Sequence, residues 1–240
     1  MNNKRIKFIT LIAMMTLAMI LTIACGKNPT SSDSGLIQSM TGEELVKQNS
    51  GKDKDKVLII DVRSPEEYKA GHIPNAINMN VDGFEDRIAE IEDLKEFPII
   101  TYCNSGKKSG DVAEILVKNG FTNVTNGAGV KEFEYDLVHY DDIRGAAFQN
   151  LIDEDKDIVL VDVRPEKQVG EEGMIEGAIN IPFDAIESNL DKLLKDKTIA
   201  LYCNTGTKSA EVAQELEGLG YENVVNAIEG VKEFNFTLIK

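Results

Sequence analysis

Two short loops, each headed by a cysteine, hold the residues of this sequence best suited to chemistry. The first reads CNSGKKS from Cys103 to Ser109, and the second reads CNTGTKS from Cys203 to Ser209. The small residues after each cysteine can turn tightly enough to point backbone N–H groups inward. Lysine and the start of a helix add positive charge, which lowers the pKa of a thiol and attracts anions. Each loop therefore predicts a nucleophilic cysteine in an anion-binding cradle.

The predicted catalytic residues are Cys103 and Cys203, and the residues that follow them are predicted to bind substrate. These binding residues are Asn104, Ser105, Gly106, Lys107, Lys108 and Ser109 in the first loop and Asn204, Thr205, Gly206, Thr207, Lys208 and Ser209 in the second. Ser109 is also expected to be a helix N-cap. A structural role is the alternative, because a free cysteine at a strand end is often part of the core. The repetition of the loop favours function.

Other kinds of cysteine chemistry are disfavoured by spacing. A zinc site needs clustered cysteine and histidine, whereas the two loops are distant and the only histidines are His72 and His139. No C-x-x-C redox pair is present. A Cys–His protease arrangement is disfavoured because the second copy of the sequence has Met174 at the position that His72 holds in the first. Cysteine-dependent phosphatases place arginine six residues after the cysteine, where this chain has Ser109 and Ser209. We predict neither a metal nor a cofactor.

The elements that must position these loops also occur twice. VLIIDVRSPEE from Val57 matches IVLVDVRPEKQ from Ile158, and GVKEF occurs at Gly129 and again at Gly230. A period of about one hundred residues indicates two domains rather than a solenoid. The predicted division is 1–24 as signal peptide, 25–35 as flexible linker, 36–138 as the first repeat and 139–240 as the second repeat.

Within each repeat, strand and helix patterns alternate. The segments 57–62 and 99–102, and their counterparts 158–163 and 199–202, are apolar runs typical of strands buried on both faces. A helical spacing of apolar residues follows each cysteine loop and ends at Gly120 or Gly220. We therefore predict an α/β fold, two tandem domains that each hold a small, mainly parallel sheet flanked by helices. Ligands of such sheets bind beyond the carboxyl ends of the strands, where both cysteines stand.

At this point the residues resemble the rhodanese family. DVRSPEEYKAGHIPNAINM, from Asp61 to Met79, is similar to the N-terminal signature of that family. The six residues from Cys103 to Lys108, and those from Cys203 to Lys208, have the usual length of its sulfurtransferase loop. The GVKEF segments resemble its late glycine-rich turn, although Phe133 and Phe234 stand where tryptophan is common. The resemblance covers nearly all of residues 36–240 as two tandem rhodanese-like domains.

The resemblance implies a reaction and a set of supporting residues. The cysteine thiolate attacks the outer sulfur of thiosulfate, polysulfide or a persulfide, a cysteine persulfide forms, and a thiophilic acceptor such as cyanide or a thiol removes the sulfur. Asp61 and Arg63, with Asp162 and Arg164 in the second repeat, are expected to support the site as strand-end ion pairs. His72 is expected to be a structural turn residue. The extra lysine of the first loop predicts that Cys103 is the stronger nucleophile.

The first residues of the chain have the pattern of a targeting segment. Lys4, Arg5 and Lys7 precede an apolar run that ends at Cys25. LTIAC resembles a bacterial lipoprotein box, with cleavage before Cys25 and lipid on its sulfur, although Thr22 stands where leucine is usual. An uncleaved membrane anchor is the alternative. Both interpretations predict an extracytoplasmic protein tethered to the cell membrane.

Charge narrows the expected partners. The net charge of −15 disfavours nucleic acid, because phosphates are repelled by an acidic chain. The expected partners are small sulfur-containing anions or persulfides and the membrane, with a protein as a further candidate acceptor. Two other functions stay open at this stage. One is a redox protein that joins Cys103 to Cys203, and the other is a non-catalytic module that uses the loops to bind anions or a partner protein.

Overall fold

The computed structural model describes residues 37–154 and 157–240. The predicted signal peptide, the lipidation site Cys25 and the linker therefore lie outside the described residues. Within those two ranges, no helix is both long and apolar enough to cross a membrane.

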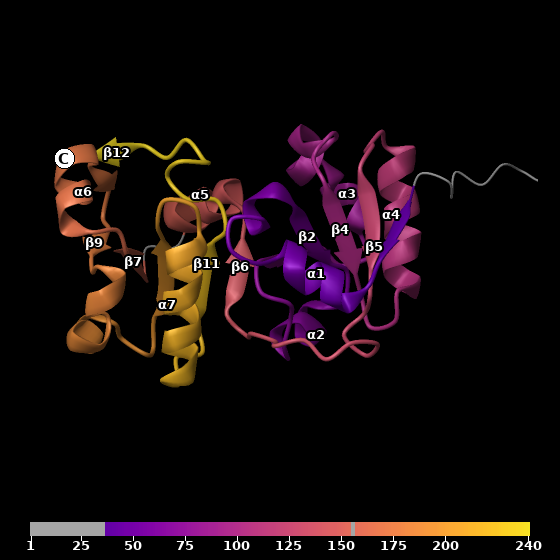
Figure 1. The fold of residues 1–240 in the computed structure, drawn as a ribbon. Coiled ribbons are helices and arrows are strands. Elements are labelled where there is room, and N and C mark those ends of the chain that lie inside the picture. The colour runs from indigo at the N-terminus through magenta and orange to yellow at the C-terminus, as the bar shows by residue number, and fades with distance from the viewer. Residues whose placement is uncertain (1–36, 155–156) are drawn as a thin grey trace, which may run out of the picture. The chain divides into compact units, whose positions relative to one another are not determined.

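The first repeat is built on a wholly parallel sheet of five strands (Figure 1). The strands follow the order β1-β5-β4-β2-β3, so β4 is central. The strands are β1 (Gln38–Met40), β2 (Leu58–Asp61), β3 (Ala76–Asn78), β4 (Ile99–Tyr102) and β5 (Val124–Gly127). The helices are α1 (Gly42–Gln48), α2 (Pro65–Lys69), α3 (Phe84–Arg87) and α4 (Lys107–Lys118), with 3₁₀ turns η1 (Lys54–Lys56) and η2 (Ile88–Leu94).

The second repeat has the same topology, with five parallel strands in the order β6-β11-β10-β7-β9. The strands are β6 (Asp141–Ile143), β7 (Ile158–Asp162), β9 (Ile179–Asn180), β10 (Thr198–Tyr202) and β11 (Val224–Ala227). The helices are α5 (Gly145–Glu154), α6 (Glu166–Glu172) and α7 (Thr207–Gly218), with 3₁₀ turns η3 (Phe183–Ala185) and η4 (Glu187–Lys192). A small antiparallel pair, β8 (Met174–Ile175) with β12 (Leu238–Ile239), is added. The predicted α/β fold is confirmed.

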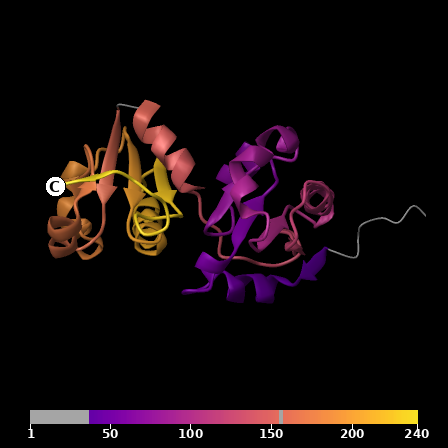
Figure 2. The ribbon, with the colours of Figure 1, turned by 90° about the horizontal axis from the view of Figure 1, so that it is seen from above.

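Each sheet has helices packed on both of its faces. Successive side chains of a strand point to opposite sides, so each strand contributes to the core on both faces. In the first repeat Ile60 packs with Leu116 of α4 on one face, while Ile59 packs with Leu45 of α1 on the other. Figure 2 shows the strands between helices in each repeat. Two covered faces explain why the strands appear in the sequence as continuous apolar runs rather than alternating ones.

Helix α4 begins closer to its cysteine than the sequence suggested. Ser109 was expected to be the N-cap of the first helix, but Gly106 holds that position with φ of +72° and α4 begins at Lys107. In the second repeat Gly206, with φ of +73°, precedes α7 in the same way. A left-handed residue between strand and helix favours glycine, which has no Cβ to clash. The N-cap prediction is therefore wrong, and Ser109 lies buried in the first turn of α4.

Candidate active site

The two cysteines stand at equivalent points of the two sheets. Cys103 directly follows β4, and Cys203 directly follows β10. Strand alternation places Tyr102 in the core on the α1 side of the sheet and Cys103 in the core on the α4 side. Both cysteines are free thiols and only 2% and 4% exposed. Both cysteines are therefore buried thiols, and the structure holds neither of them in the disulfide that a redox role would use.

The sulfur of Cys103 lies in a cradle of hydrogen-bond donors. The Ser109 Oγ is 3.4 Å from the Cys103 Sγ, and backbone N–H groups of the loop and of the first turn of α4 also bond to the sulfur. These N–H groups belong to Ser105, Lys108 and Ser109. In the second repeat the Ser209 Oγ is 3.5 Å from the Cys203 Sγ. The early helix start brings the serine to the sulfur.

The cradle changes the acidity of the first cysteine. Burial acts to raise the pKa of the Cys103 thiol, because it penalises the charged form. The hydrogen bonds from the Ser109 hydroxyl and from the backbone N–H groups outweigh burial, so the pKa lies below its usual value. No acidic residue occupies the first turn of α4 to oppose this effect. The arrangement favours the thiolate, which is the nucleophilic form.

The GVKEF segment fastens each cysteine loop through the backbone. Val130 N–H donates to the Cys103 carbonyl and Lys131 N–H to the Asn104 carbonyl, both at 3.0 Å, and the second repeat repeats both bonds at the same distances. Gly129 approaches so closely that a Cβ there would lie 2.3 Å from the Asn104 oxygen. At Gly230 a Cβ would lie 2.2 Å from the Asn204 carbonyl carbon. Only glycine permits this contact, which fixes the position of the loop.

A side-chain amide also holds the first loop. Asn126 in β5 donates from Nδ2 to the Gly106 carbonyl at 2.8 Å and accepts at Oδ1 from the Ser109 hydroxyl at 2.7 Å. The Gly106 carbonyl can only accept, so it fixes which end of the Asn126 amide faces Ser109. Asn126 therefore connects the N-cap of α4 to the serine that touches the sulfur, and the single Ser109 hydroxyl proton is shared between Asn126 Oδ1 and Cys103 Sγ.

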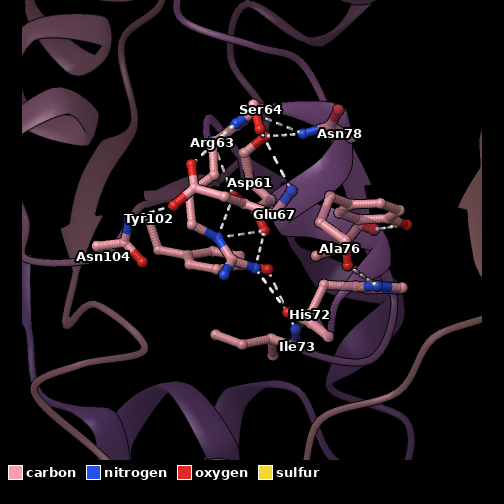
Figure 3. Close-up of polar contacts among 12 residues, drawn as sticks. Asp61, Arg63, Ser64, Glu67, His72, Ile73, Ala76, Asn78, Tyr102 and Asn104 are labelled. Atoms are coloured by element: carbon pink, nitrogen blue, oxygen red, sulfur yellow. Dashed lines mark hydrogen bonds and ion pairs between the residues drawn. The ribbon is translucent and has the colours of Figure 1, made fainter.

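Asp61 and Arg63 form the expected ion pair at the end of β2 (Figure 3). The Asp61 carboxylate accepts from the backbone N–H, the Nε and the terminal nitrogen of Arg63, at 2.6 to 3.0 Å. The same arginine nitrogen donates to the Gly71 carbonyl at 2.7 Å, and the guanidinium lies 5.8 Å from the centre of the Tyr102 ring. The pair is buried and joins the strand end to the His72 turn. It touches the neighbour of Cys103 rather than the cysteine itself, which is a supporting role.

The second repeat keeps this pair and adds a carboxylate. Asp162 binds Arg164 with the same geometry, and the arginine donates to the Gly173 carbonyl at 2.7 Å. The other terminal nitrogen of Arg164 donates to Glu172 Oε2 at 3.0 Å. In the first repeat Ala70 stands where Glu172 stands here.

The lysines of the loops are exposed at the helix starts. Lys107 and Lys108 extend from the first turn of α4. Lys208 is paired with Glu211 at 2.5 Å and lies over the Phe183 ring at 4.7 Å. Within the described residues, the first loop thus exceeds the second in unpaired positive charge by more than the lysine numbers alone suggested.

One further side chain touches each loop at the residue after the cysteine. Glu67 Oε1 accepts from Asn104 Nδ2 at 2.7 Å (Figure 3). In the second repeat Gln168 donates from Nε2 to Asn204 Oδ1 at 2.8 Å. Both residues lie on the helix that follows the Asp-x-Arg pair.

His72 is a structural residue, as the sequence indicated. It is fully buried, its ring stacks on that of Tyr68 at 3.7 Å, and its Nδ1 lies 3.2 Å from the Tyr68 carbonyl oxygen. Within the described residues, no group of three or more His, Cys, Asp or Glu side chains is placed to hold a metal ion.

Sequence reasoning missed several of these contacts. The residues concerned are Glu67, Asn126, Gln168 and the two serines in their contact with sulfur. Asn126 had a visible signal, because asparagine recurs at 226 in the second repeat. The serines had one too, since both repeats place serine six residues after the cysteine.

Comparisons with known proteins give this site a family. The model of the rhodanese-like domain matches residues 43–130 and again residues 146–236. Thiosulfate sulfurtransferase PspE of Escherichia coli is 41% identical over 73 residues, 30% of this chain and 70% of its own length. Thiosulfate:glutathione sulfurtransferase of Saccharomyces cerevisiae is 32% identical over 111 residues, 42% of this chain and 79% of its own length.

A third relative is a sulfurtransferase of Allochromatium vinosum, which is 31% identical over 83 residues, 35% of this chain and 76% of its own length. Each relative spans less than half of the chain, whereas the family model matches both repeats. The chain therefore belongs to the rhodanese family and is a sulfurtransferase with two tandem rhodanese-like domains.

Proposed function

We propose that the protein moves sulfane sulfur from thiosulfate, polysulfide or a persulfide to a thiophilic acceptor through a cysteine persulfide. The observation that carries this proposal is the Cys103 sulfur, which lies in a cradle of hydroxyl and backbone N–H donors at the start of α4. Donors around the sulfur stabilise negative charge there, both on the Cys103 thiolate and on the outer sulfur of an anionic persulfide, which lies one bond beyond Sγ.

The first half-reaction uses thiosulfate as the simplest donor. The Cys103 thiolate attacks the outer sulfur, a bond forms between that sulfur and Sγ, and the bond to the sulfonate sulfur breaks. The electron pair of the broken bond leaves with sulfite, and the new persulfide keeps a negative charge, so no oxidant is needed. Lys107 and Lys108 attract the dianionic donor, and the N–H groups of the loop hold the persulfide that remains.

The second repeat supports a second working site. Cys203 has the same serine contact, the same backbone bonds from the glycine turn and the same buried ion pair. We propose that both cysteines form persulfides, with Cys103 the stronger nucleophile because two exposed lysines lie beside it.

The test is thiosulfate:cyanide sulfur transfer by the full-length chain, beside Cys103→Ala, Cys203→Ala and the double variant. Thiocyanate formation should fall more in Cys103→Ala than in Cys203→Ala and vanish only in the double variant. Turnover that survives Cys103→Ala unchanged would overturn the ranking of the two sites. If no form is active although mass spectrometry shows intact thiols, sulfur transfer from thiosulfate is wrong, and a binding module becomes the better interpretation.

We also propose that the chain is tethered outside the cytoplasm through lipid on Cys25. The support is the sequence of the first residues, where three basic residues, an apolar run and LTIAC occur in the order of a lipoprotein signal. Mass spectrometry of the membrane-extracted protein should find a lipid-modified cysteine at the new N-terminus, and Cys25→Ser should abolish it. A chain that keeps residues 1–24 would instead support the uncleaved anchor.

A further inference from the structure

The two cysteine loops are each touched by one side chain of equivalent position and different charge. In the first repeat the Glu67 carboxylate accepts from Asn104, which directly follows Cys103, at 2.7 Å. In the second repeat Gln168 exchanges two hydrogen bonds with Asn204, at 2.8 and 3.2 Å. The same loop is thus held by a carboxylate in one repeat and by a neutral amide in the other.

The Glu67 carboxylate is fixed in place and ionised. Its Oε2 accepts from the Ser64 backbone N–H at 3.4 Å, and its own N–H donates to the Ser64 hydroxyl at 3.2 Å, which is a capping box at the start of α2. The bond from Asn104 is the largest cause that holds the pKa of Glu67 below its usual value. A fixed negative charge therefore stands beside the Cys103 loop at neutral pH.

In the second repeat the nearby carboxylate is that of Glu172, which bonds to Arg164 and Gln168 instead of to the loop asparagine. Glu172 Oε2 accepts from Arg164 at 3.0 Å and from the Gln168 Nε2 at 3.0 Å. Arg164, which also binds Asp162, thus pairs with this carboxylate, and the residue that contacts the loop is neutral. The difference between the repeats is one unit of charge at the side chain that touches the residue after the cysteine.

We propose that Glu67 is a specificity-determining residue of the Cys103 site, which makes that site favour a thiol acceptor that carries an ammonium group over an anionic thiol. The Cys203 site, where Gln168 stands, lacks this preference. This inference rests on the proposed function, and it concerns the step in which the persulfide gives up its sulfur.

That step balances without an external oxidant or reductant. The acceptor loses its thiol proton to solvent, and its thiolate attacks the outer sulfur of the Cys103 persulfide. A bond forms between the acceptor sulfur and the outer sulfur, and the bond between the outer sulfur and Sγ breaks. The electron pair returns to Sγ as thiolate, and the acceptor leaves as its persulfide.

The charges around the first loop match an amino thiol. Lys107 and Lys108 lie exposed on the α4 side, and Glu67 contacts the loop from α2. An acceptor with a thiolate at one end and an ammonium group at the other can place each charge toward the opposite charge of the protein. A thiol with a carboxylate instead brings its second negative charge beside Glu67.

Three small thiols of different charge test the proposal: 2-aminoethanethiol, 2-mercaptoethanol and mercaptoacetate. The full-length Cys203→Ala variant isolates Cys103, and Cys103→Ala isolates Cys203. Each is loaded with thiosulfate, and single-turnover transfer rates are compared after correction for the thiolate fraction of each acceptor. We expect Cys103 to favour the cationic over the anionic thiol by about 3- to 10-fold, an effect that added salt reduces.

Two reciprocal substitutions locate the cause. Glu67→Gln should remove the preference at Cys103, and Gln168→Glu should create one at Cys203. Glutamine keeps the bond to the loop asparagine, as the second repeat shows, so the loop should remain folded. Glu66→Gln removes an exposed charge from the same helix and is the matched control, expected to leave the preference in place.

The outcomes separate this inference from the function on which it rests. If persulfide forms and transfers but Glu67→Gln leaves the ratio of cationic to anionic rates unchanged, the role of Glu67 is wrong and the sulfurtransferase proposal stands. If thiosulfate loads neither cysteine in any variant, the proposed function fails first. A preference that vanishes with Glu66→Gln as well would assign the effect to the general charge of the surface rather than to Glu67.

Discussion

Asn126 and Asn226 occupy the same position in the two repeats, yet their amides bond to different partners. Asn126 donates to the Gly106 carbonyl and accepts from Ser109. Asn226 instead donates to Asp142 Oδ1 at 2.7 Å, and its Oδ1 has no hydrogen-bond partner within the described part of the chain. The first asparagine therefore holds the cysteine loop and the second does not.

The neighbouring strand decides this difference. In β1 the residue opposite Asn126 is Ser39, whereas in β6 the residue opposite Asn226 is Asp142. A buried carboxylate is a strong acceptor and attracts the amide away from the loop. In the second repeat the Gly206 carbonyl is instead contacted by the Ser209 hydroxyl, which lies 3.1 Å from it and also lies near the Cys203 sulfur. Two loops of nearly identical sequence are thus held by different side chains.

The largest expected effect comes from Asp61→Asn, which tests the buried pair. Removing the charge leaves Arg63 buried without a counter-ion, so we expect a loss of about 3–5 kcal/mol in the free energy of unfolding. Asp162→Asn should cost less, because Glu172 still pairs with Arg164. Urea unfolding followed by circular dichroism measures both, with the exposed Asp82→Asn as control. Equal losses in the two repeats would show that Glu172 does not compensate.

Gly129→Ala tests the contact that the repeats share. A Cβ would lie 2.3 Å from the backbone of Asn104, so the loop must move away from the GVKEF turn. We expect about a 100-fold loss of thiosulfate turnover at Cys103, measured with Cys203→Ala in the background. Gly230→Ala should do the same at Cys203.

The control for the glycine turn is Gly170→Ala, where no atom lies within 4 Å of an added Cβ. Full activity of Gly129→Ala would mean that the loop adapts to the shift and that its position is not set by the turn.

Ser109→Ala tests the serine contact to sulfur. The Ser109 hydroxyl is one of the groups that lower the pKa of Cys103, so its removal should raise that pKa. Below its pKa the thiol then holds less thiolate, and alkylation by iodoacetamide at neutral pH should slow by about 10-fold. The pH profile of alkylation with Cys203→Ala in the background measures the midpoint.

Ser105→Ala keeps the backbone N–H groups and changes only an exposed side chain, so it should leave the Cys103 profile unmoved. A midpoint that stays the same in Ser109→Ala would assign the lowered pKa to the backbone alone.

The smallest effect concerns the charge of the loops. Lys107→Thr gives the first loop the residue of the second, and we expect KM for thiosulfate at Cys103 to rise by about 2- to 5-fold, less at high salt. Thr207→Lys should lower KM at Cys203. Unchanged KM values at low salt would mean that the backbone N–H groups alone bind the anion.

The sequence by itself determined the class of fold and the position of the two cysteines at strand ends. Continuous apolar runs predict strands covered on both faces, and the structure has them in two parallel sheets. The helix ends were also predicted, since Gly120 and Gly220 have φ of +87° and +81° where glycine is favoured. These features follow from local geometry and burial, which are encoded by neighbouring residues.

The tertiary structure alone decided how each sulfur is held. Whether Ser109 caps α4 or contacts Cys103 depends on the residue at which the helix begins. The identities of Ser109 and Cys103 do not determine that residue. Whether an asparagine holds the loop depends on Asp142, a residue more than sixty positions from Cys203 in the chain. Hydrogen bonds between distant segments are set by strand register, and register becomes visible only when the sheet is assembled.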